Sequence, residues 1–387
     1  MAGKLKLIYI DPPFFSKSNY DAVLHAGDEN IKHLAYGDKW EKGLSQYLKM
    51  LTVRLMLMKD LLADDGLIWL HLDWHVVHYA KVIMDEIFGE KNMVNEIIWT
   101  YKSGGTSKKH FARKHDTILV YSKSGKYDFY PVKEKSYNRQ FKPYRFKGVK
   151  EYKDDIGWYT MVNMKDVWSI DMVGRTSSER TGYATQKPEQ LLERIIESCT
   201  REGDICADFF CGSGTLPAVA AKMNRRFIGC DEGRLAVEST MSRLNRQDSD
   251  FAVYDTVTNN KSGLRANIQL TSQEVPGTDD VLIRLSIASI TEKSMTKVID
   301  KETKEKVRKM IKENSLQIIE YWSVDFDCID NVHRPEVIFM RTKGHLEASC
   351  ERIIKGKTTI GVKVVDIFGN VTFERIEYEG NTKTEIN

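Results

Sequence analysis

Residues 7–14 read LIYIDPPF, and this stretch sets the first expectation about the fold. Its first four residues are bulky and apolar, a pattern typical of a short strand buried in a parallel sheet. Pro12 and Pro13 follow, and proline neither donates to a strand ladder nor continues a helix. The strand therefore ends at Asp11, with the aromatic ring of Phe14 close behind this carboxylate.

Working outward, apolar periodicity predicts strands that alternate with helices. The expected strands are 5–10, 67–72, 95–101, 205–209 and 226–230, and the expected helices are 44–62, 76–88, 188–200 and 216–223. Such alternation implies right-handed crossovers and a mostly parallel sheet that is covered on both faces. Two α/β blocks separated by an insertion are expected to build this sheet together.

Length and composition are those of a globular protein with two or three domains. The chain has 387 residues, of which 41% are hydrophobic and 29% are charged. It contains no apolar run of roughly 20 residues and no signal-peptide pattern at its start, so a cytoplasmic protein without a membrane segment is expected. The six cysteines include no C-x-x-C pair, which argues against a zinc ribbon or a disulfide framework.

Charge is unevenly distributed along the chain. The formal net charge is only +3, but residues 101–160 contain 15 Lys and Arg against 6 Asp and Glu, a local net of +9. The same window contains 13 aromatic residues interleaved with the cations. Cations neutralise phosphates and flat rings stack on bases, so this mixture favours nucleic acid. A solvated β-rich insertion with an ordinary aromatic core is the competing interpretation.

A glycine-rich loop is predicted at residues 208–215, DFFCGSGT, between a strand and a helix. Gly212 and Gly214 allow the backbone to approach a ligand, and the helix start offers free N–H groups. The spacing is neither G-x-G-x-x-G nor a P-loop, so a small adenosyl ligand is favoured over a dinucleotide. Asp231 follows the next strand, where a carboxylate can bind ribose hydroxyls. Ordinary βα turns are the alternative explanation for each loop taken alone.

The predicted adenosyl site suggests a catalytic role for Asp11. Strand ends line the ligand crevice of a doubly wound sheet, so Asp11 is expected beside the atoms that react with the adenosyl ligand. A carboxylate there can accept a hydrogen bond from an exocyclic amine, the Pro12 carbonyl can accept a second one, and Phe14 offers a face for a flat base. Taken alone, Asp-Pro-Pro is more often a simple loop cap.

Together these residues resemble the beta class of amino-methylating DNA methyltransferases. Asp11 to Phe14 match the D-P-P-[YF] catalytic motif, and Phe210 to Gly214 match the F-x-G-x-G cofactor motif, in the permuted order of that class. Three further stretches, 166–170, 178–199 and 362–370, are similar to modification subunits of type III restriction systems. The resemblance implies a Rossmann-like methyltransferase sheet with S-adenosylmethionine as the cofactor.

The resemblance also implies chemistry, partners and site residues. It implies transfer to adenine N6, flipping of the target adenine onto Phe14, and no metal ion. Double-stranded DNA is the expected partner, and a restriction or helicase subunit and a homodimer are further expected partners. The implied catalytic residues are Asp11, Pro12, Pro13 and Phe14. The implied cofactor-binding residues are Asp208, Phe210, Gly212, Gly214, Thr215, Asp231, Gln186, Lys187 and Pro188.

Four segments are expected from these patterns. Residues 1–100 form the catalytic half of the methyltransferase domain, 101–180 the target-recognition insertion, 181–258 the cofactor-binding half, and 259–387 a C-terminal α+β domain. In that last segment, a helix is expected at 292–314 and a hairpin turning at 368–370. Members of the family carry a longer segment with a Gly-Asp-Asn turn before the catalytic strand, so a fragment, a misplaced start, or closure by another segment such as a strand at 251–255 is expected.

Other functions stay open at this point. Cytosine-N4 members of the family usually carry Ser-Pro-Pro-Tyr, so Asp11 favours adenine over cytosine. Methylation of RNA or of a protein amide uses a similar motif, and a non-catalytic DNA-binding subunit would also fit the short start. A nicotinamide oxidoreductase is disfavoured by the glycine spacing. His71, His75 and His78 are grouped like metal ligands, but surface or capping roles are favoured.

Overall fold

The computed structural model describes residues 1–26, 29–254, 264–292, 301–329, 332–342, 345–379 and 384–386. The chain divides into two compact units, each built from several stretches of sequence. The first unit contains Met1–Ser18, Asp38–Arg180 and Thr185–Asp231, and the second contains Asn19–Gly37, Thr181–Ala184 and Glu232–Asn387. The sequence predicts a domain boundary after residue 258, whereas the second unit already includes the chain from Glu232 onward.

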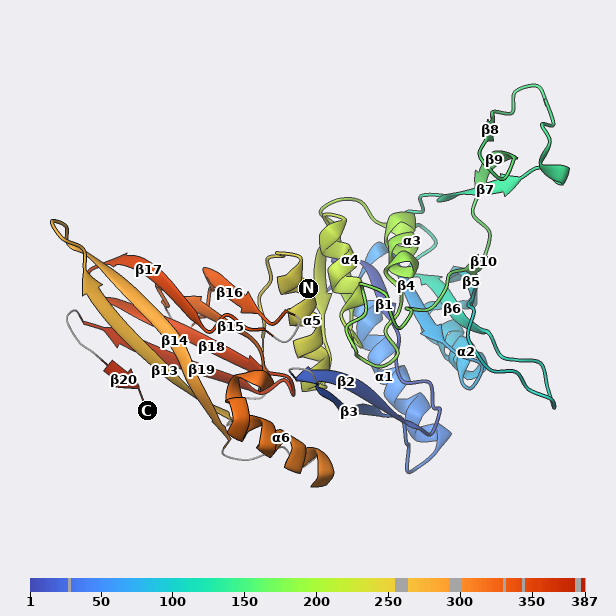
Figure 1. Cartoon of the computed structure of the whole chain (residues 1–387). Helices are drawn as coiled ribbons and strands as arrows, with labels where there is room; N and C mark the ends of the chain where they lie inside the picture. The colour runs from blue at the N-terminus through green and yellow to red at the C-terminus, as the bar shows by residue number, and fades with distance from the viewer. Residues whose placement is uncertain are drawn as a thin grey trace. The chain divides into compact units, whose positions relative to one another are not determined.

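A seven-stranded sheet forms the centre of the first unit, in the order β10-β5-β6-β4-β1-β11-β12 (Figure 1). Neighbouring strands are parallel except where β6 pairs antiparallel with β4 and β5. The two predicted α/β blocks therefore do share one mostly parallel sheet. The strands are β1 (Leu5–Ile10), β4 (Leu62–Leu72), β5 (Met93–Thr100), β6 (His115–Ser122), β10 (Val167–Ser169), β11 (Ile205–Asp208) and β12 (Arg226–Gly229).

Helices cover both faces of this sheet, because strand side chains point alternately to opposite sides. Ile8 and Ile10 of β1 pack with α1 (Leu44–Leu61) and α2 (Val77–Phe88). Leu7 and Tyr9 pack on the other face with α3 (Glu189–Cys199) and α4 (Thr215–Lys222). Among the described residues, no helix has both the length and the apolar character needed to cross a membrane.

The boundaries of two predicted segments in this unit are wrong. The strand expected at 67–72 begins earlier, because β4 starts at Leu62. Residues 115–122, inside the expected insertion, form the central strand β6, whose apolar run is typical of a strand buried on both faces. The inserted part is a separate three-stranded sheet, β7-β9-β8, made of β7 (Lys133–Tyr137), β8 (Glu151–Lys153) and β9 (Trp158–Asn163).

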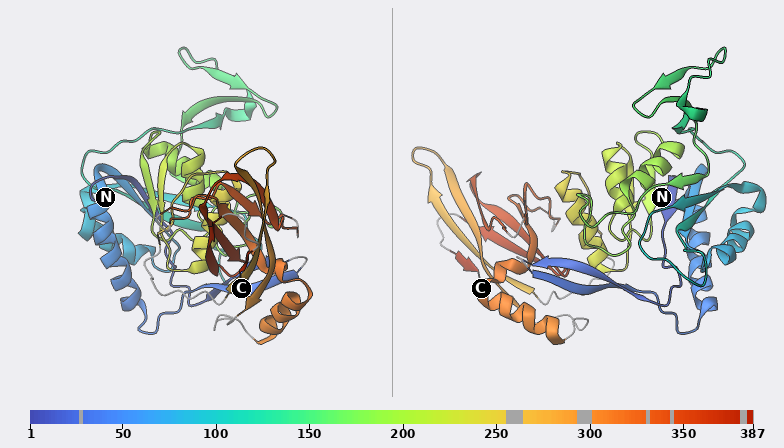
Figure 2. Two further views of the ribbon diagram at one scale, coloured as in Figure 1. Left: turned by 90° about the vertical axis from the view of Figure 1, so that its left-hand side faces the viewer. Right: turned by 45° about the vertical axis from the view of Figure 1, so that its right-hand side comes forward.

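The second unit contains two antiparallel four-stranded sheets that share one core (Figure 2). The predicted hairpin is confirmed, with Gly369 at φ 77° in its turn. The first sheet contains β13 (Leu264–Glu274), β14 (Asp280–Glu292), β17 (Ser349–Lys355) and β20 (Thr384–Ile386); the second contains β15 (Ile319–Asp325), β16 (Val337–Met340), β18 (Thr358–Asp366) and β19 (Val371–Tyr378). Helices α5 (Arg234–Arg246) and α6 (Lys301–Asn314) complete the unit.

Several expectations for this part of the chain need correction. The helix expected at 292–314 begins at Lys301 as far as the described residues show, because Glu292 ends β14 and 293–300 lie outside them. Residues 251–254 form no strand, and Asp255 lies outside the described residues. The residues after Phe14, for which the sequence predicts no strand, contain the hairpin β2 (Asn19–Ala26) and β3 (Glu29–Gly37), whose Ala26 and Ile31 join the core of the second unit.

A buried carboxyl group in the second unit makes its stability depend on pH. Burial of Glu238 on α5 raises its pKa to about 7, and Asp366 adds to the rise, while Lys363, Tyr321 and Arg234 oppose it. Because this pKa lies above the ordinary value, the contribution of Glu238 to stability is complete below about pH 4.5 and is lost as the pH rises through 7. The loss amounts to about 3 kcal/mol for this one group.

Glu238→Gln is therefore expected to flatten the fall in unfolding free energy between pH 5 and pH 8. Urea unfolding of both proteins at several pH values measures this slope. Glu305→Gln, at an exposed position on α6, is the matched control and should keep the slope of the parent protein. Equal slopes for the Glu238 variant and the parent would show that Glu238 ionises normally in the folded unit.

Candidate functional site

Two acidic residues lie at the same edge of the seven-stranded sheet. Strands β1 and β11 are parallel neighbours, with Ile8 opposite Ala207. Asp208 ends β11 and Asp11 follows β1, so both carboxyl groups lie at the carboxyl ends of adjacent strands. This edge is where open α/β sheets bind ligands. The fold thus places the predicted catalytic acid beside the predicted glycine-rich loop.

Asp11 forms a buried ion pair with Lys187. The Lys187 ammonium donates to Asp11 Oδ2, and the two side chains are only 10% and 16% exposed. The same ammonium lies 5.2 Å from the centre of the Phe14 ring. The second carboxylate oxygen, Asp11 Oδ1, is buried and has no hydrogen-bond partner among the described residues. A buried acceptor of this kind is costly unless a ligand supplies a donor.

Phe14 rests against a buried hydrogen-bonded network. Its ring centre lies 5.9 Å from that of His71, which has no exposed surface. His71 Nδ1 lies 2.8 Å from the Tyr9 hydroxyl, and His71 Nε2 lies 3.2 Å from Asp116 Oδ2. The Tyr101 hydroxyl donates to the other Asp116 oxygen over 3.0 Å. The network therefore fixes the imidazole on which Phe14 rests.

Burial and nearby charges shift the pKa values of Tyr9 and Asp116 in this network. Burial raises the pKa of Tyr9, and the nearby carboxylates of Asp11 and Asp208 raise it further, so its hydroxyl keeps its proton. Burial also acts to raise the pKa of Asp116, but His71 and the more distant Lys187 outweigh it and the pKa falls. Asp116 is thus an ionised acceptor at the rear of the site.

The glycine-rich loop adopts the conformation that its sequence predicts. Gly212 and Gly214 have φ of 48° and 72°, values in the left-handed region that favours glycine. The Gly214 N–H donates to the Cys211 carbonyl over 2.7 Å, and Gly214 directly precedes α4. The Gly212 N–H donates to Asp231 Oδ2 over 3.0 Å. The loop after β11 is thereby tied to the loop after β12.

Asp208 differs chemically from the other acids of the site. One of its side-chain oxygens accepts the Phe210 N–H over 3.0 Å. Burial raises the pKa of Asp208 well above its usual range, and the charges of Asp11 and Asp231 add to this, while Phe210 and Lys187 act in the opposite direction. Burial therefore disfavours the charged form of Asp208, whereas the Asp11 carboxylate is paired with a cation.

Residues 186–188 connect the two halves of the site. The Gln186 side chain donates to the Glu179 carbonyl over 2.6 Å, and Pro188 immediately precedes α3. The Thr215 hydroxyl donates to the Lys187 carbonyl over 3.1 Å. Lys187 thus contacts Asp11 through its side chain and the start of α4 through its backbone. The structure brings these predicted residues together around one sheet edge.

Sequence reasoning missed the residue that shapes the loop after Phe14. Phe15 and Lys17 have φ of 60° and 61°, which is uncommon for residues with side chains. Asp38, which is fully buried, accepts the Ser16 N–H over 2.6 Å and the Trp40 indole N–H over 2.8 Å. No local signal identifies Asp38, because it lies on the far side of the β2–β3 hairpin. Tyr9 and Asp116 were missed for the same reason, since only strand pairing brings them to His71.

The three clustered histidines do not converge. His71 contacts Tyr9 and Asp116 as described, and His75 Nδ1 lies 2.6 Å from Asp73 Oδ2. In the described parts of the chain, no group of three or more His, Cys, Asp or Glu is arranged to hold a metal ion. The nitrogens of His71 serve the network behind Phe14.

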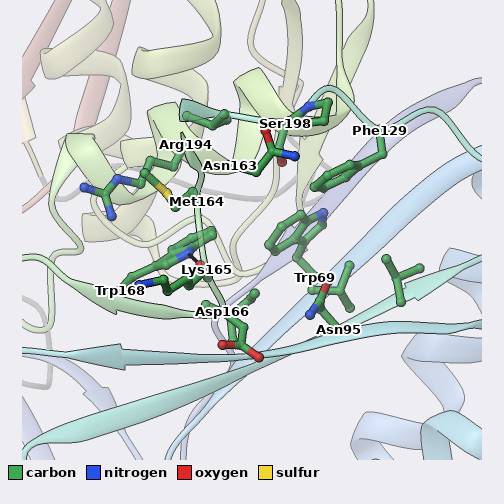
Figure 3. Close-up of a pocket in the computed structure, with 15 residues that line it drawn as sticks. Trp69, Asn95, Phe129, Asn163, Met164, Lys165, Asp166, Trp168, Arg194 and Ser198 are labelled. Atoms are coloured by element: carbon green, nitrogen blue, oxygen red, sulfur yellow. Dashed lines mark hydrogen bonds between the residues drawn. The ribbon is translucent and has the colours of Figure 1, made fainter. Parts of the chain in front are cut away.

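A separate cavity of about 250 Å³ lies beside the start of β5, on a different part of the sheet from Asp11 (Figure 3). Trp69 and Asn95 border it from the sheet, Arg194 from α3, and Phe129 from the segment before β7. Asn95 lies near the start of β5, whereas Asp11 follows the end of β1, and these two strands run in the same direction. The cavity is therefore distinct from the Asp11 site.

The outer wall of this cavity is formed by the two connections to the inserted sheet. The Met164 N–H donates to the Val132 carbonyl over 2.9 Å, and the Tyr130 N–H donates to the Ser198 carbonyl of α3 over 2.7 Å. Both connections are thus hydrogen-bonded where they leave the first unit's core. The root of the inserted sheet is positioned by α3.

The inserted sheet uses its aromatic residues in two ways. Tyr152 stacks on Tyr159 at 5.6 Å between ring centres, and Tyr137 meets Tyr159 edge to face, so some rings form a small core. Other rings face solvent, with Phe141 50% and Phe146 62% exposed. The window that the sequence singled out is therefore partly an aromatic core and partly an exposed surface of rings among cations.

Comparison with known proteins identifies the family. The family model described as DNA methylase, covering N6 and N4 enzymes, matches residues 5–242. The type II methyltransferase M.EcaI of Enterobacter cloacae is 30% identical over 307 residues, covering 62% of this chain and 65% of that protein. M2.DpnII of Streptococcus pneumoniae is 30% identical over 248 residues, covering 63% and 84%. The chain thus spans just under two thirds of the Enterobacter relative's length.

Two solved structures described as DNA methylases are among those to which this chain is similar. The cytosine-N4-specific PvuII DNA methyltransferase shares 13% identity with a TM-score of 0.43, covering 66% of this chain and 82% of that one. The Thermus thermophilus TTHA0409 modification methylase, solved with S-adenosyl-L-methionine, shares 17% identity with a TM-score of 0.42, covering 67% and 93%. Since the family model spans more than half of the residues, this chain belongs to the N6/N4 DNA methylase family.

Proposed function

We propose that this chain is a DNA methyltransferase that transfers a methyl group from S-adenosylmethionine to N6 of an adenine flipped out of duplex DNA. One observation carries the proposal. Asp11 presents a buried oxygen without a partner among the described residues, beside Phe14 and across from the glycine-rich loop. An acceptor, a stacking ring and a cofactor loop at one sheet edge are what amino methylation requires.

The residues around the loop suit an adenosyl cofactor with a charged amino acid end. When bound, S-adenosylmethionine supplies a methyl group on a positively charged sulfur. Gly212 and Gly214 add no side chains of their own to the loop, and the start of α4 offers N–H groups to a carboxylate. The Lys187 ammonium, which contacts Asp11, supplies positive charge, and the Lys187 carbonyl contacts the start of α4. Asp231, at the end of β12, is the residue assigned to the ribose hydroxyls.

Asp11 is assigned to the acceptor nitrogen. Its Oδ1 accepts a hydrogen bond from the exocyclic amine of the target base and stabilises the positive charge that develops on that nitrogen during transfer. Lys187 holds the carboxylate in place through Oδ2. Phe14 stacks on the base and fixes its plane, and the rigid network at His71 fixes Phe14 in turn. Positioning and electrostatics therefore account for the rate enhancement without a covalent intermediate.

Duplex DNA is the proposed substrate. A stacked base cannot enter a crevice of this kind, so the target adenine leaves the helix at a cost of a few kcal/mol. The exposed rings and cations of the inserted sheet are assigned to sequence recognition. The named relatives are type II methyltransferases, so protection of DNA from a matching restriction enzyme is the proposed role. A restriction subunit of the type III kind and a homodimer stay predictions.

The test is to incubate the protein with labelled S-adenosylmethionine and unmethylated mixed-sequence duplex DNA, then to separate the nucleosides. Label in N6-methyladenine is the expected result. Label in N4-methylcytosine would support the same mechanism but show that cytosine, and not adenine, is the target base. Label only in RNA or in protein, offered in parallel, would replace the substrate class. Absence of label in every substrate, at cofactor concentrations shown to bind, would contradict the proposed function.

A further inference from the structure

The connection between β5 and β6 contains a fully exposed aromatic ring within a basic segment. Residues 102–114 contain five Lys and Arg and no Asp or Glu. Phe111, three residues before the end of this segment, is 99% exposed. Figure 1 shows the segment as a long projection beyond the ends of β5 and β6. Burial of a ring that is bare in the free protein is favourable, because it removes apolar surface from water.

The base of this segment is fixed beside the candidate active site. The Tyr101 N–H donates to the Lys114 carbonyl over 3.2 Å, and the Lys114 ammonium bonds the Ser103 and Gly104 carbonyls over 2.8 and 2.7 Å. Tyr101 and Asp116, which flank the segment, belong to the network behind Phe14. The projection therefore leaves the protein beside the hydrogen-bonded network that supports Phe14, the residue assigned to the flipped base.

Arg113, near the end of the same segment, also contacts Trp74, which lies outside the segment. The Arg113 guanidinium lies 3.8 Å from the ring centre of Trp74, next to the start of α2. Lys108 and Lys109 precede Phe111 and are exposed. The ring thus sits between cations that can contact phosphates on either side of a base step.

We propose that Phe111 inserts into the DNA base stack at the position that the target base vacates. This inference rests on the proposed function and names a part of it. Removing a base leaves an apolar gap between its neighbours, and a flat ring fills that gap by stacking. The cations of residues 102–114 hold the backbone around the gap. Phe14 receives the flipped base on one side, and Phe111 replaces it in the duplex.

The test compares binding to an intact duplex with binding to the same duplex carrying one abasic site, measured by fluorescence anisotropy. The abasic site offers a ready gap, so the parent protein should bind that duplex roughly tenfold more tightly. Phe111→Ala should lose most of this preference, and Phe111→Trp should keep it. Phe111 is exposed, so its replacement is not expected to affect folding, and circular dichroism checks this.

Met56→Ala, at an exposed apolar position on α1, is the matched control and should keep the preference. No preference in the parent protein, or an undiminished preference in Phe111→Ala, would overturn the inference. Because this assay requires no methyl transfer, its outcome is independent of the labelling experiment. If the DNA is labelled but Phe111→Ala still prefers the abasic duplex as strongly as the parent protein, the proposed function holds. Only the insertion of Phe111 is then rejected.

Discussion

Replacement of Asp11 by Asn is expected to lower kcat/KM for methyl transfer roughly 100- to 1,000-fold. The amide keeps the shape of the side chain and one acceptor oxygen, but it lacks the negative charge that stabilises the nitrogen during transfer. Binding of S-adenosylmethionine, measured by calorimetry, should change far less than the rate. Initial rates with duplex DNA at saturating cofactor measure the effect.

The control for this variant is Asp60→Asn, which removes an exposed carboxylate from the end of α1. It should keep the rate and the unfolding midpoint of the parent protein. A rate for Asp11→Asn within a few fold of the parent would mean that the carboxylate does not act on the acceptor nitrogen. A loss of folding in the Asp11 variant, seen by circular dichroism, would make Asp11 a structural residue instead.

Replacement of Lys187 by Met is expected to be nearly as damaging. The change leaves the Asp11 carboxylate buried without its cation, and loss of one member of such a pair costs about 2–5 kcal/mol. The same change removes the positive charge assigned to the carboxylate end of the cofactor. A drop of roughly 30-fold or more in kcat/KM is therefore expected, together with weaker cofactor binding. Calorimetry and initial rates separate the two effects.

Lys222→Met is the matched control for that experiment. Lys222 also pairs with a carboxylate, Glu189 Oε2 at 2.6 Å, but its side chain is 46% exposed. Exposed pairs contribute at most about 1 kcal/mol, so this variant should lose less than about fivefold in rate. Similar losses in both variants would mean that the Lys187 effect comes from charge in general and not from its contact with Asp11.

Much of the first unit could be predicted from local sequence. The apolar run before Asp11 predicts β1, and the helical spacing of residues 44–62 predicts α1, because each element carries its own burial pattern. The chemistry-bearing loops were predicted as well, since Asp-Pro-Pro-Phe and the glycine pair each follow a strand. The order of these motifs along the chain then implied one shared sheet.

Elements whose buried partners lie far away in sequence were harder to predict. The β2–β3 hairpin reads as a polar loop, because its core residues Ala26 and Ile31 pack against strands more than 200 residues later. Strand β6 was placed in the insertion because basic residues surround it, although its own apolar run is typical of a central strand. In both cases tertiary contacts, and not local propensity, decide the outcome.

The supporting residues of the site follow the same rule. Asp11 and Phe14 are adjacent in sequence and could be named together. His71, Tyr9 and Asp116 lie on three different strands, and only the pairing of β1, β4 and β6 brings them into one network. Local sequence therefore identifies the reacting residues better than it identifies the residues that hold them in place.

The most direct test of the account is the amount of N6-methyladenine that the parent protein and Asp11→Asn each form in duplex DNA, measured by mass spectrometry of the nucleosides. The account predicts N6-methyladenine with the parent protein and at least roughly 100-fold less with the variant under equal cofactor saturation. Equal amounts with both proteins, or no methylated base with a folded parent protein that binds the cofactor, would contradict it.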